Sequence, residues 1–263
     1  EPAPVVLVTG PEQLLAERAI RAVRDRMRDA DPSLEVSDID AGAYAPGELL
    51  TLASPSLFAE PRLIRVSQVE KATDAFLEEA LAYLAEPADD TVLVLRHAGG
   101  VRGKKLLDTI RSGTGGGVEV VCAELKREGD KIDFAAAEFR AAKRKATPGA
   151  VRALVSAFTD DLAELAAACR QLISDTDGDI TEAVVDRYYA GRAEVTAFAV
   201  ADAAIAGRPG EALGLMRHAL ASGSDPVPMV AAFAMKIRTM AKLAGARGSS
   251  SFAIVRIFIA NAA

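Results

Sequence analysis

Short apolar runs alternate with amphipathic stretches through the first half of the chain. Most runs are rich in valine, leucine and isoleucine, as expected of strands buried on both faces. We predict strands at residues 5–9, 35–40, 62–66, 91–96 and 118–122. Apolar residues recur every four positions at Leu15, Ala19, Val23 and Met27, which favours an amphipathic helix, and further helical stretches lie at 48–53, 75–84 and 104–110. Strands that alternate with helices predict a five-stranded, mostly parallel sheet with right-handed crossovers.

After about residue 125 no further strands are predicted, and residues 126–145 form a charged stretch that ends at a turn signal, Thr147-Pro148-Gly149. Apolar stripes and capping signals such as Asp161 and Thr181 predict a series of helices. They lie at residues 151–158, 162–173, 182–189, 195–206, 210–221 and 226–243. The last has apolar residues at Val227, Val230, Ala231, Ala234, Ile237 and Ala241. We therefore expect an α/β domain at 1–125 and two small all-α domains at 126–190 and 191–263.

Residues after Gly245 fit this organisation poorly. A stretch rich in glycine and serine leads into residues 252–259, which are almost wholly apolar. That run is shorter than the ~20 residues that a membrane-spanning helix requires. It is either a buried element or the sign of a truncated or altered terminus after about residue 245.

The first strand leads into a degenerate phosphate-binding loop. A nucleotide-binding P-loop has the pattern G-x-x-x-x-G-K-[ST] between a strand and a helix. Counted from Gly10, the second glycine is replaced by Leu15, the lysine by Ala16 and the hydroxyl residue by Glu17. The acidic pair that would hold magnesium after the third strand is also missing, since Glu70 comes too late. The sequence predicts the fold of a nucleotide-binding domain without the residues that bind phosphate and magnesium. We therefore expect no bound cofactor.

Composition narrows the class of protein further. The net charge is −6 and the pI about 5.2, so no global basic field attracts nucleic acid. The two cysteines, Cys122 and Cys169, indicate a reducing compartment, and together with the isolated His97 and His218 they offer no metal-ligand spacing. Neither a signal peptide nor a membrane span is evident, so we expect a cytoplasmic protein with no metal site.

Four segments in this order resemble the delta subunit of bacterial DNA polymerase III, the wrench of the clamp loader. The first is VTGPEQLLAERA at 8–19, and the second is SPSLFAEPRLI at 54–64. The third is DLAELAAACRQL at 161–172, and the fourth joins GRPGEALGL at 207–215 to GSDP at 223–226. The resemblance covers roughly residues 3–245, and the family usually continues with more helices.

The resemblance implies an AAA+-like fold that neither binds nor hydrolyses ATP, followed by lid-like and collar-like helical domains. It implies a non-catalytic subunit of the polymerase III holoenzyme that binds the sliding clamp, the beta subunit, and helps open it for loading onto primed DNA. The further partners implied are the ATPase motor and stator subunits, and primed DNA within the assembled complex. Ser56, Leu57 and Phe58 are similar to the family's clamp-binding residues.

Other interpretations remain open at this stage. The chain could be a divergent nucleotide-binding ATPase, against which Leu15, Ala16 and Glu17 argue, or a direct DNA-binding module, against which the acidic pI argues. Leu57 and Phe58 could instead pack under the sheet edge as core residues.

Overall fold

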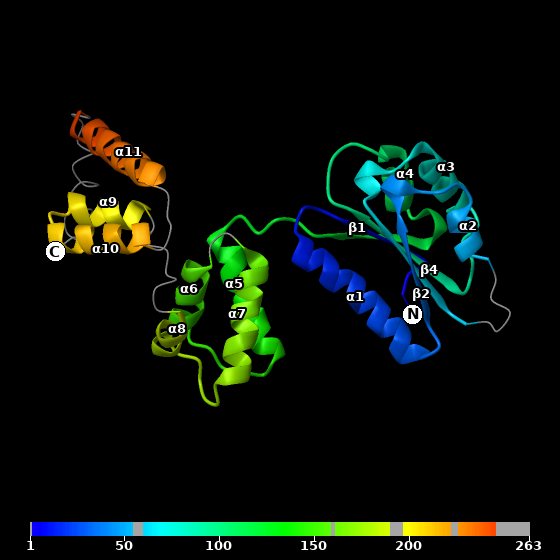
Figure 1. The fold of residues 1–263 in the computed structure, drawn as a ribbon, viewed down its shortest axis with the longest axis horizontal. Coiled ribbons are helices and arrows are strands. Elements are labelled where there is room, and N and C mark those ends of the chain that lie inside the picture. The colour runs from blue at the N-terminus through cyan, green and yellow to red at the C-terminus, as the bar shows by residue number, and fades with distance from the viewer. Residues whose placement is uncertain (1, 55–59, 159–160, 190–196, 222–225, 246–263) are drawn as a thin grey trace. The chain divides into compact units, whose positions relative to one another are not determined.

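The computed structural model describes residues 2–54, 60–158, 161–189, 197–221 and 226–245 (Figure 1). The chain divides into two compact units, Glu1–Lys126 and Arg127–Ala263. The predicted further boundary near Gly191 and the apolar run at 252–259 lie outside the described residues. Among the helices that are described, none combines the length and the apolar character needed to cross a membrane.

The first unit is built on a fully parallel five-stranded sheet, as the apolar runs predict. Its order is β2-β3-β4-β1-β5, which places the first strand between the fourth and the fifth. The strands are β1 Val5–Thr9, β2 Glu35–Asp40, β3 Arg62–Ser67, β4 Thr91–His97 and β5 Gly117–Val121. The polar composition of β2 follows from its place at an edge, where β3 is its strand partner in the sheet.

Helices cover both faces of this sheet (Figure 1). Side chains alternate along β1, so Val5 and Leu7 belong to the core beneath α2, α3 and α4, whereas Val6 and Val8 belong to the core beneath α1. The helices are α1 Gln13–Ala30, α2 Glu48–Leu52, α3 Asp74–Tyr83 and α4 Lys104–Arg111. Short 3-10 turns follow β2, β3 and α4 at Ala41–Ala43, Val69–Lys71 and Thr114–Gly116.

The second unit begins with a group of four helices. These are α5 Glu128–Ala141, α6 Pro148–Ala157, α7 Leu162–Asp175 and α8 Glu182–Tyr189. Their buried residues include Phe139, Leu154, Leu165 and Cys169, so the stripe that contains Cys169 is core, as its spacing predicts. The side chain of Asp161 accepts hydrogen bonds from Ala163 N and Glu164 N, which confirms its predicted role as the cap of α7.

Three further helices are described in the second unit: α9 Ala197–Ile205, α10 Pro209–Ala221 and α11 Pro226–Gly245. Helix α9 packs against both α10 and α11, and Lys236 on α11 pairs with Asp202 on α9 at 2.6 Å. Met229 and Ala232 of α11 are buried, and neither belongs to the apolar stripe predicted from the sequence. The buried face of α11 is therefore a different face from the predicted one. Val227 and Val230 on that stripe are each 68% exposed.

Candidate functional site

The candidate site lies where β1 turns into α1, at the carboxyl ends of the sheet strands. Gly10 has φ +118°, and a Cβ there would lie 2.2 Å from the carbonyl oxygen of Cys122. Its amide donates to the carbonyl of His97 (3.1 Å), and the amide of Glu12 donates to that of Cys122 (3.1 Å). The turn is therefore packed against the ends of β4 and β5, and two of its amides are already bound to protein carbonyls. Only glycine fits at position 10.

The anion-binding position of this turn is taken by a side chain of the chain itself. A helix N-terminus attracts anions because its first amides lack acceptors within the helix. Here the Glu12 side chain caps α1 by accepting a hydrogen bond from Leu14 N at 3.2 Å. A carboxylate thus stands at the end of the helix that faces a phosphate in nucleotide-binding loops.

The residues that replace the P-loop consensus lie inside α1 rather than in a loop. The helix begins at Gln13, so Leu15, Ala16 and Glu17 are already in its first two turns. Ala16 is only 1% exposed and belongs to the core on the α1 face of the sheet. Glu17 is exposed and accepts a hydrogen bond from Gln13 Nε2 at 2.7 Å. A lysine at position 16 would point into the apolar core. The turn therefore differs from a P-loop in its backbone conformation as well as in its residue types.

Acidic groups near the ends of β2 and β3 bind neighbouring loops. Glu70 accepts a hydrogen bond from the amide of Ala98 at 3.0 Å. Asp40 accepts from Gln68 Nε2 at 2.6 Å and from the amide of Gly42 at 2.8 Å. Across the part of the chain that the structure describes, no three His, Cys, Asp or Glu residues are grouped so that they could hold a metal ion.

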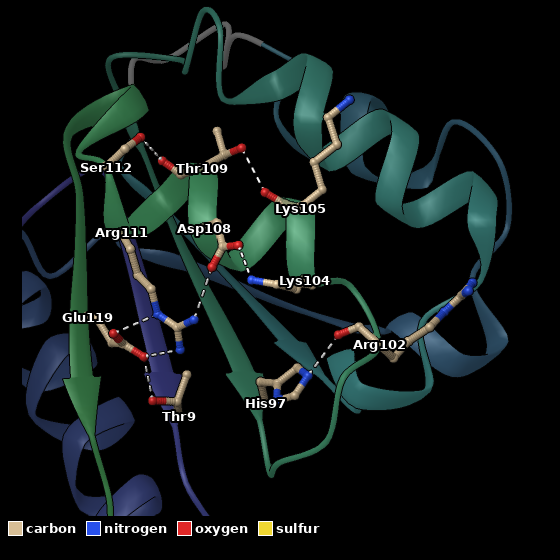
Figure 2. A network of polar contacts seen from close by, with 10 residues as sticks. All are labelled: Thr9, His97, Arg102, Lys104, Lys105, Asp108, Thr109, Arg111, Ser112 and Glu119. Atoms are coloured by element: carbon tan, nitrogen blue, oxygen red, sulfur yellow. Dashed lines mark hydrogen bonds and ion pairs between the residues drawn. The ribbon is translucent and has the colours of Figure 1, made fainter.

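His97 and Arg102 tie the loop after β4 to its neighbours (Figure 2). His97 is 2% exposed and its Nε2 lies 3.1 Å from the carbonyl oxygen of Arg102. The guanidinium of Arg102 donates to the carbonyl of Ala72 at 2.9 Å and to Asp74 at 2.6 Å. These contacts connect the end of β4 to the start of α3, and they give His97 the structural role that its isolation in the sequence predicts.

A polar network runs from Gly10's neighbour Thr9 across β5 to α4 (Figure 2). Thr9 Oγ1 donates to Glu119 at 2.7 Å, and Arg111 donates to the same carboxylate from Nε (2.9 Å) and Nη2 (2.8 Å). The hydrogen bonds from Arg111, followed by that from Thr9, hold the pKa of Glu119 below its ordinary value. Arg111 also contacts Asp108, whose pKa is lowered first by its hydrogen bond from Lys104.

Sequence reasoning did not find this network. The spacing of Lys104, Asp108 and Arg111 at i, i+4 and i+7 is a usable signal for one helix face. The link to Glu119 and Thr9 is not visible in the sequence, because it depends on α4 lying beside β5.

The predicted clamp-binding residues Ser56, Leu57 and Phe58 lie outside the described residues. The chain on either side of them is described. Ser54 donates its amide to the carbonyl of Thr51 (3.3 Å) and its hydroxyl to that of Leu50 (2.8 Å), which extends the end of α2. Arg62 opens β3 on the other side.

Comparison with known proteins gives matches among solved structures. No family model and no curated protein sequence matches the chain. The Bacillus subtilis DNA clamp loader delta protein YqeN matches in structure with a TM-score of 0.60 and 17% identity, over 89% of this chain and 72% of that one. A Thermotoga maritima RuvB variant matches with a TM-score of 0.44 and 13% identity, over 89% and 80% of the two chains.

The first unit is thus an AAA+-like α/β domain with a degenerate P-loop turn, followed by helices. This is the fold class that the alternating pattern and the resemblance predict, and the match to YqeN confirms it.

Proposed function

We propose that this chain is a non-catalytic clamp-loader subunit of the delta type, which binds a sliding clamp and helps open it for loading onto primed DNA. The observation that carries the proposal is the likeness in fold to a clamp loader delta protein over 89% of the chain. The four sequence segments that resemble the delta family also support it. In such a loader its partners are the clamp, the motor and stator subunits, and primed DNA.

The turn after β1 supports the non-catalytic part of the proposal. Phosphate binding in a P-loop uses free backbone amides and a lysine. In this chain the amides of Gly10 and Glu12 are bound to carbonyls of β4 and Cys122, and the lysine position is the buried Ala16. The Glu12 carboxylate at the start of α1 would also repel a phosphate. The competing ATPase interpretation is therefore disfavoured.

The clamp-binding part rests on Ser56, Leu57 and Phe58. Two large apolar side chains between Pro55 and Pro61 form a segment suited to entering an apolar pocket on a partner. Burying a leucine or phenylalanine side chain contributes roughly 1.5–3 kcal/mol. We therefore expect the pair to dominate the affinity for the clamp.

The test is to measure clamp binding by the full chain carrying Leu57→Ala with Phe58→Ala. Affinity should fall about 10²- to 10⁴-fold, as expected for the loss of roughly 3–6 kcal/mol, and the melting temperature should stay close to that of the unchanged protein. Surface plasmon resonance with immobilised clamp gives the first quantity and circular dichroism the second.

Val101→Ala is the matched control, because Val101 is an apolar residue that is 89% exposed on a different loop. It should change neither quantity. A double variant that melts much lower but binds the clamp normally per folded molecule would show that Leu57 and Phe58 are core residues. Absence of clamp binding by the unchanged chain would overturn the proposed function itself.

A further inference from the structure

The two edges of the sheet carry different side chains. Edge strand β2 presents acidic residues such as Glu35 and Asp38, and charges of this kind keep an edge strand from pairing with another chain. Strand β5 forms the other edge, because β1 is its strand partner in the sheet. Its valines Val118, Val120 and Val121 are 46%, 37% and 66% exposed. The edge at β5 is therefore apolar where the edge at β2 is charged.

The side chains of β5 divide between the two faces of the sheet. Glu119 lies on the α4 face, where it accepts hydrogen bonds from Arg111 and Thr9 (Figure 2). Val118 and Val120 lie on the opposite face, because they pair in register with the β1 residues that pack beneath α1. An added strand would therefore meet two valines on one face. On the other face it would meet a carboxylate that its own chain already holds.

The backbone groups at this edge follow from the pairing of β5 with β1. The amide of Cys122 donates to the carbonyl of Thr9 at 2.6 Å. Backbone groups alternate between the two sides of a strand, so those of Val120 also point to β1, while those of Glu119 and Val121 point away from it. Amides and carbonyls at the spacing of a strand edge are recognised by another extended strand.

We propose that two copies of this chain associate through β5, with the two strands antiparallel about a two-fold axis at Val120. In this register Val120 lies opposite its counterpart in the second copy, and Glu119 lies opposite Val121. A register centred on Glu119 would place two carboxylates directly opposite each other, which is unfavourable. Pairing ends at two copies, because each sheet has one apolar edge and its β2 edge is charged.

This dimer forms at high protein concentration. A pair of five-residue strands is a small contact beside the roughly 1,200–2,000 Å² that a standard stable interface buries. The chain is therefore monomeric when dilute and increasingly dimeric as it is concentrated. The inference goes beyond the proposed function and does not depend on it, because its tests involve no clamp.

Analytical ultracentrifugation of the full chain over a concentration series measures the dissociation constant of the dimer. The average mass should rise with concentration from 27.5 kDa towards twice that value. Val120→Lys should weaken the dimer at least about 10-fold, because two cations would face each other at the axis. Val121→Lys should leave the dimer unchanged or tighten it by up to about 10-fold, because the added cation lies opposite Glu119 of the other copy.

Val101→Lys is the matched control. It adds the same charge at an apolar residue that is 89% exposed on the loop after β4, and it should leave the dissociation constant unchanged. A chain that stays monomeric at every concentration would overturn the inference. So would a dimer that Val120→Lys weakens no more than Val121→Lys does.

A second measurement reads the register without relying on the folding of a lysine variant. Opposed residues at the axis form a non-hydrogen-bonded pair with Cα atoms about 4.5 Å apart, which a disulfide can span. With oxidised glutathione as the oxidant, Val120→Cys should give a disulfide-linked dimer on a non-reducing gel, and Val121→Cys should not. The native Cys122 and Cys169 are buried in the folded chain. Cross-linking of Val121→Cys that equals or exceeds that of Val120→Cys would overturn the proposed pairing.

Discussion

Single residues set the chemistry of the turn after β1. Gly10 allows the backbone to pass within contact of the Cys122 carbonyl, and Glu12 then caps α1. Ala16 fills the space beneath the helix where a functional loop would present a lysine. Each residue suits a tight structural turn, and together they argue against phosphate binding at this turn.

Gly10→Ala should destabilise the first unit strongly. The left-handed φ strains any L-residue by about 1–2 kcal/mol, and the added Cβ also meets backbone at 2.2 Å, so we expect a total loss of at least about 2 kcal/mol. Urea unfolding followed by circular dichroism measures the effect. Gly113→Ala is the control, since its φ is +85° but nothing lies within 4 Å of its Cβ. Equal losses for the two variants would mean that close packing against Cys122 has no energetic weight.

At the scale of elements, α4 is joined to the sheet by polar contacts as well as by its apolar face. Leu106, Leu107 and Ile110 are buried beneath it, while Arg111 reaches Glu119 on β5 (Figure 2). Glu119 in turn accepts from Thr9, next to the Gly10 turn. The network therefore joins the helix to β5 and to the end of β1, where the candidate site begins.

Glu119→Gln should destabilise the protein at neutral pH by roughly 1–2 kcal/mol, because it weakens charge-assisted hydrogen bonds to a partly exposed arginine. The pKa of Glu119 is lower in the folded state than in the unfolded state. The carboxylate's contribution is therefore fully present above its unfolded pKa, near 4.3, and is lost as the pH falls through the folded value.

Unfolding midpoints of the two proteins should accordingly differ at pH 7 and converge in acid. Glu78→Gln, which changes an exposed carboxylate on α3, should show no such convergence. A gap between Glu119→Gln and the unchanged protein that persisted undiminished at low pH would indicate a packing effect instead.

At the scale of the whole molecule, an AAA+-like α/β unit is followed by a unit built of helices in the part of the chain that the structure describes. The fold likeness to the delta protein extends over 89% of this chain, so it includes both the sheet unit and much of the helical unit. One fold can host different functions, so a domain with this fold can bind other proteins when it lacks the residues that bind a nucleotide.

Titration of the full chain with Mg-ATP should give no saturable heat in isothermal calorimetry. The reason is the closed turn at Gly10, the buried Ala16 and the carboxylate of Glu12 at the helix start. Mg-ADP serves as the competitor in a parallel titration. Micromolar binding of ATP that ADP displaces would favour a divergent ATPase over the proposed subunit.

The sequence by itself determined most of the elements, because strand and helix periodicities are local properties. Helix α5, Glu128–Ala141, is an exception, since this charged stretch was not predicted as a helix. All five strands lie within one residue of the predicted positions, and the polar run at 35–40 is indeed a strand. Capping by Asp161 was likewise readable, since a cap and its amides are neighbours in the chain. The replaced P-loop residues were also evident from their order alone.

Only the tertiary structure decided which residues of different elements contact one another. The proximity of Gly10 to Cys122, the pairing of Glu119 with Arg111 and Thr9, and the reach of Arg62 to Leu52 each join residues on different elements. The direction of the apolar stripe on α11 was equally hidden, because a helix pattern fixes a face but not the neighbour that it packs on. Periodicity indicates which side chains lie on the same face of an element. Packing between segments that are distant in the sequence determines whether that face is buried, hydrogen-bonded or exposed to solvent.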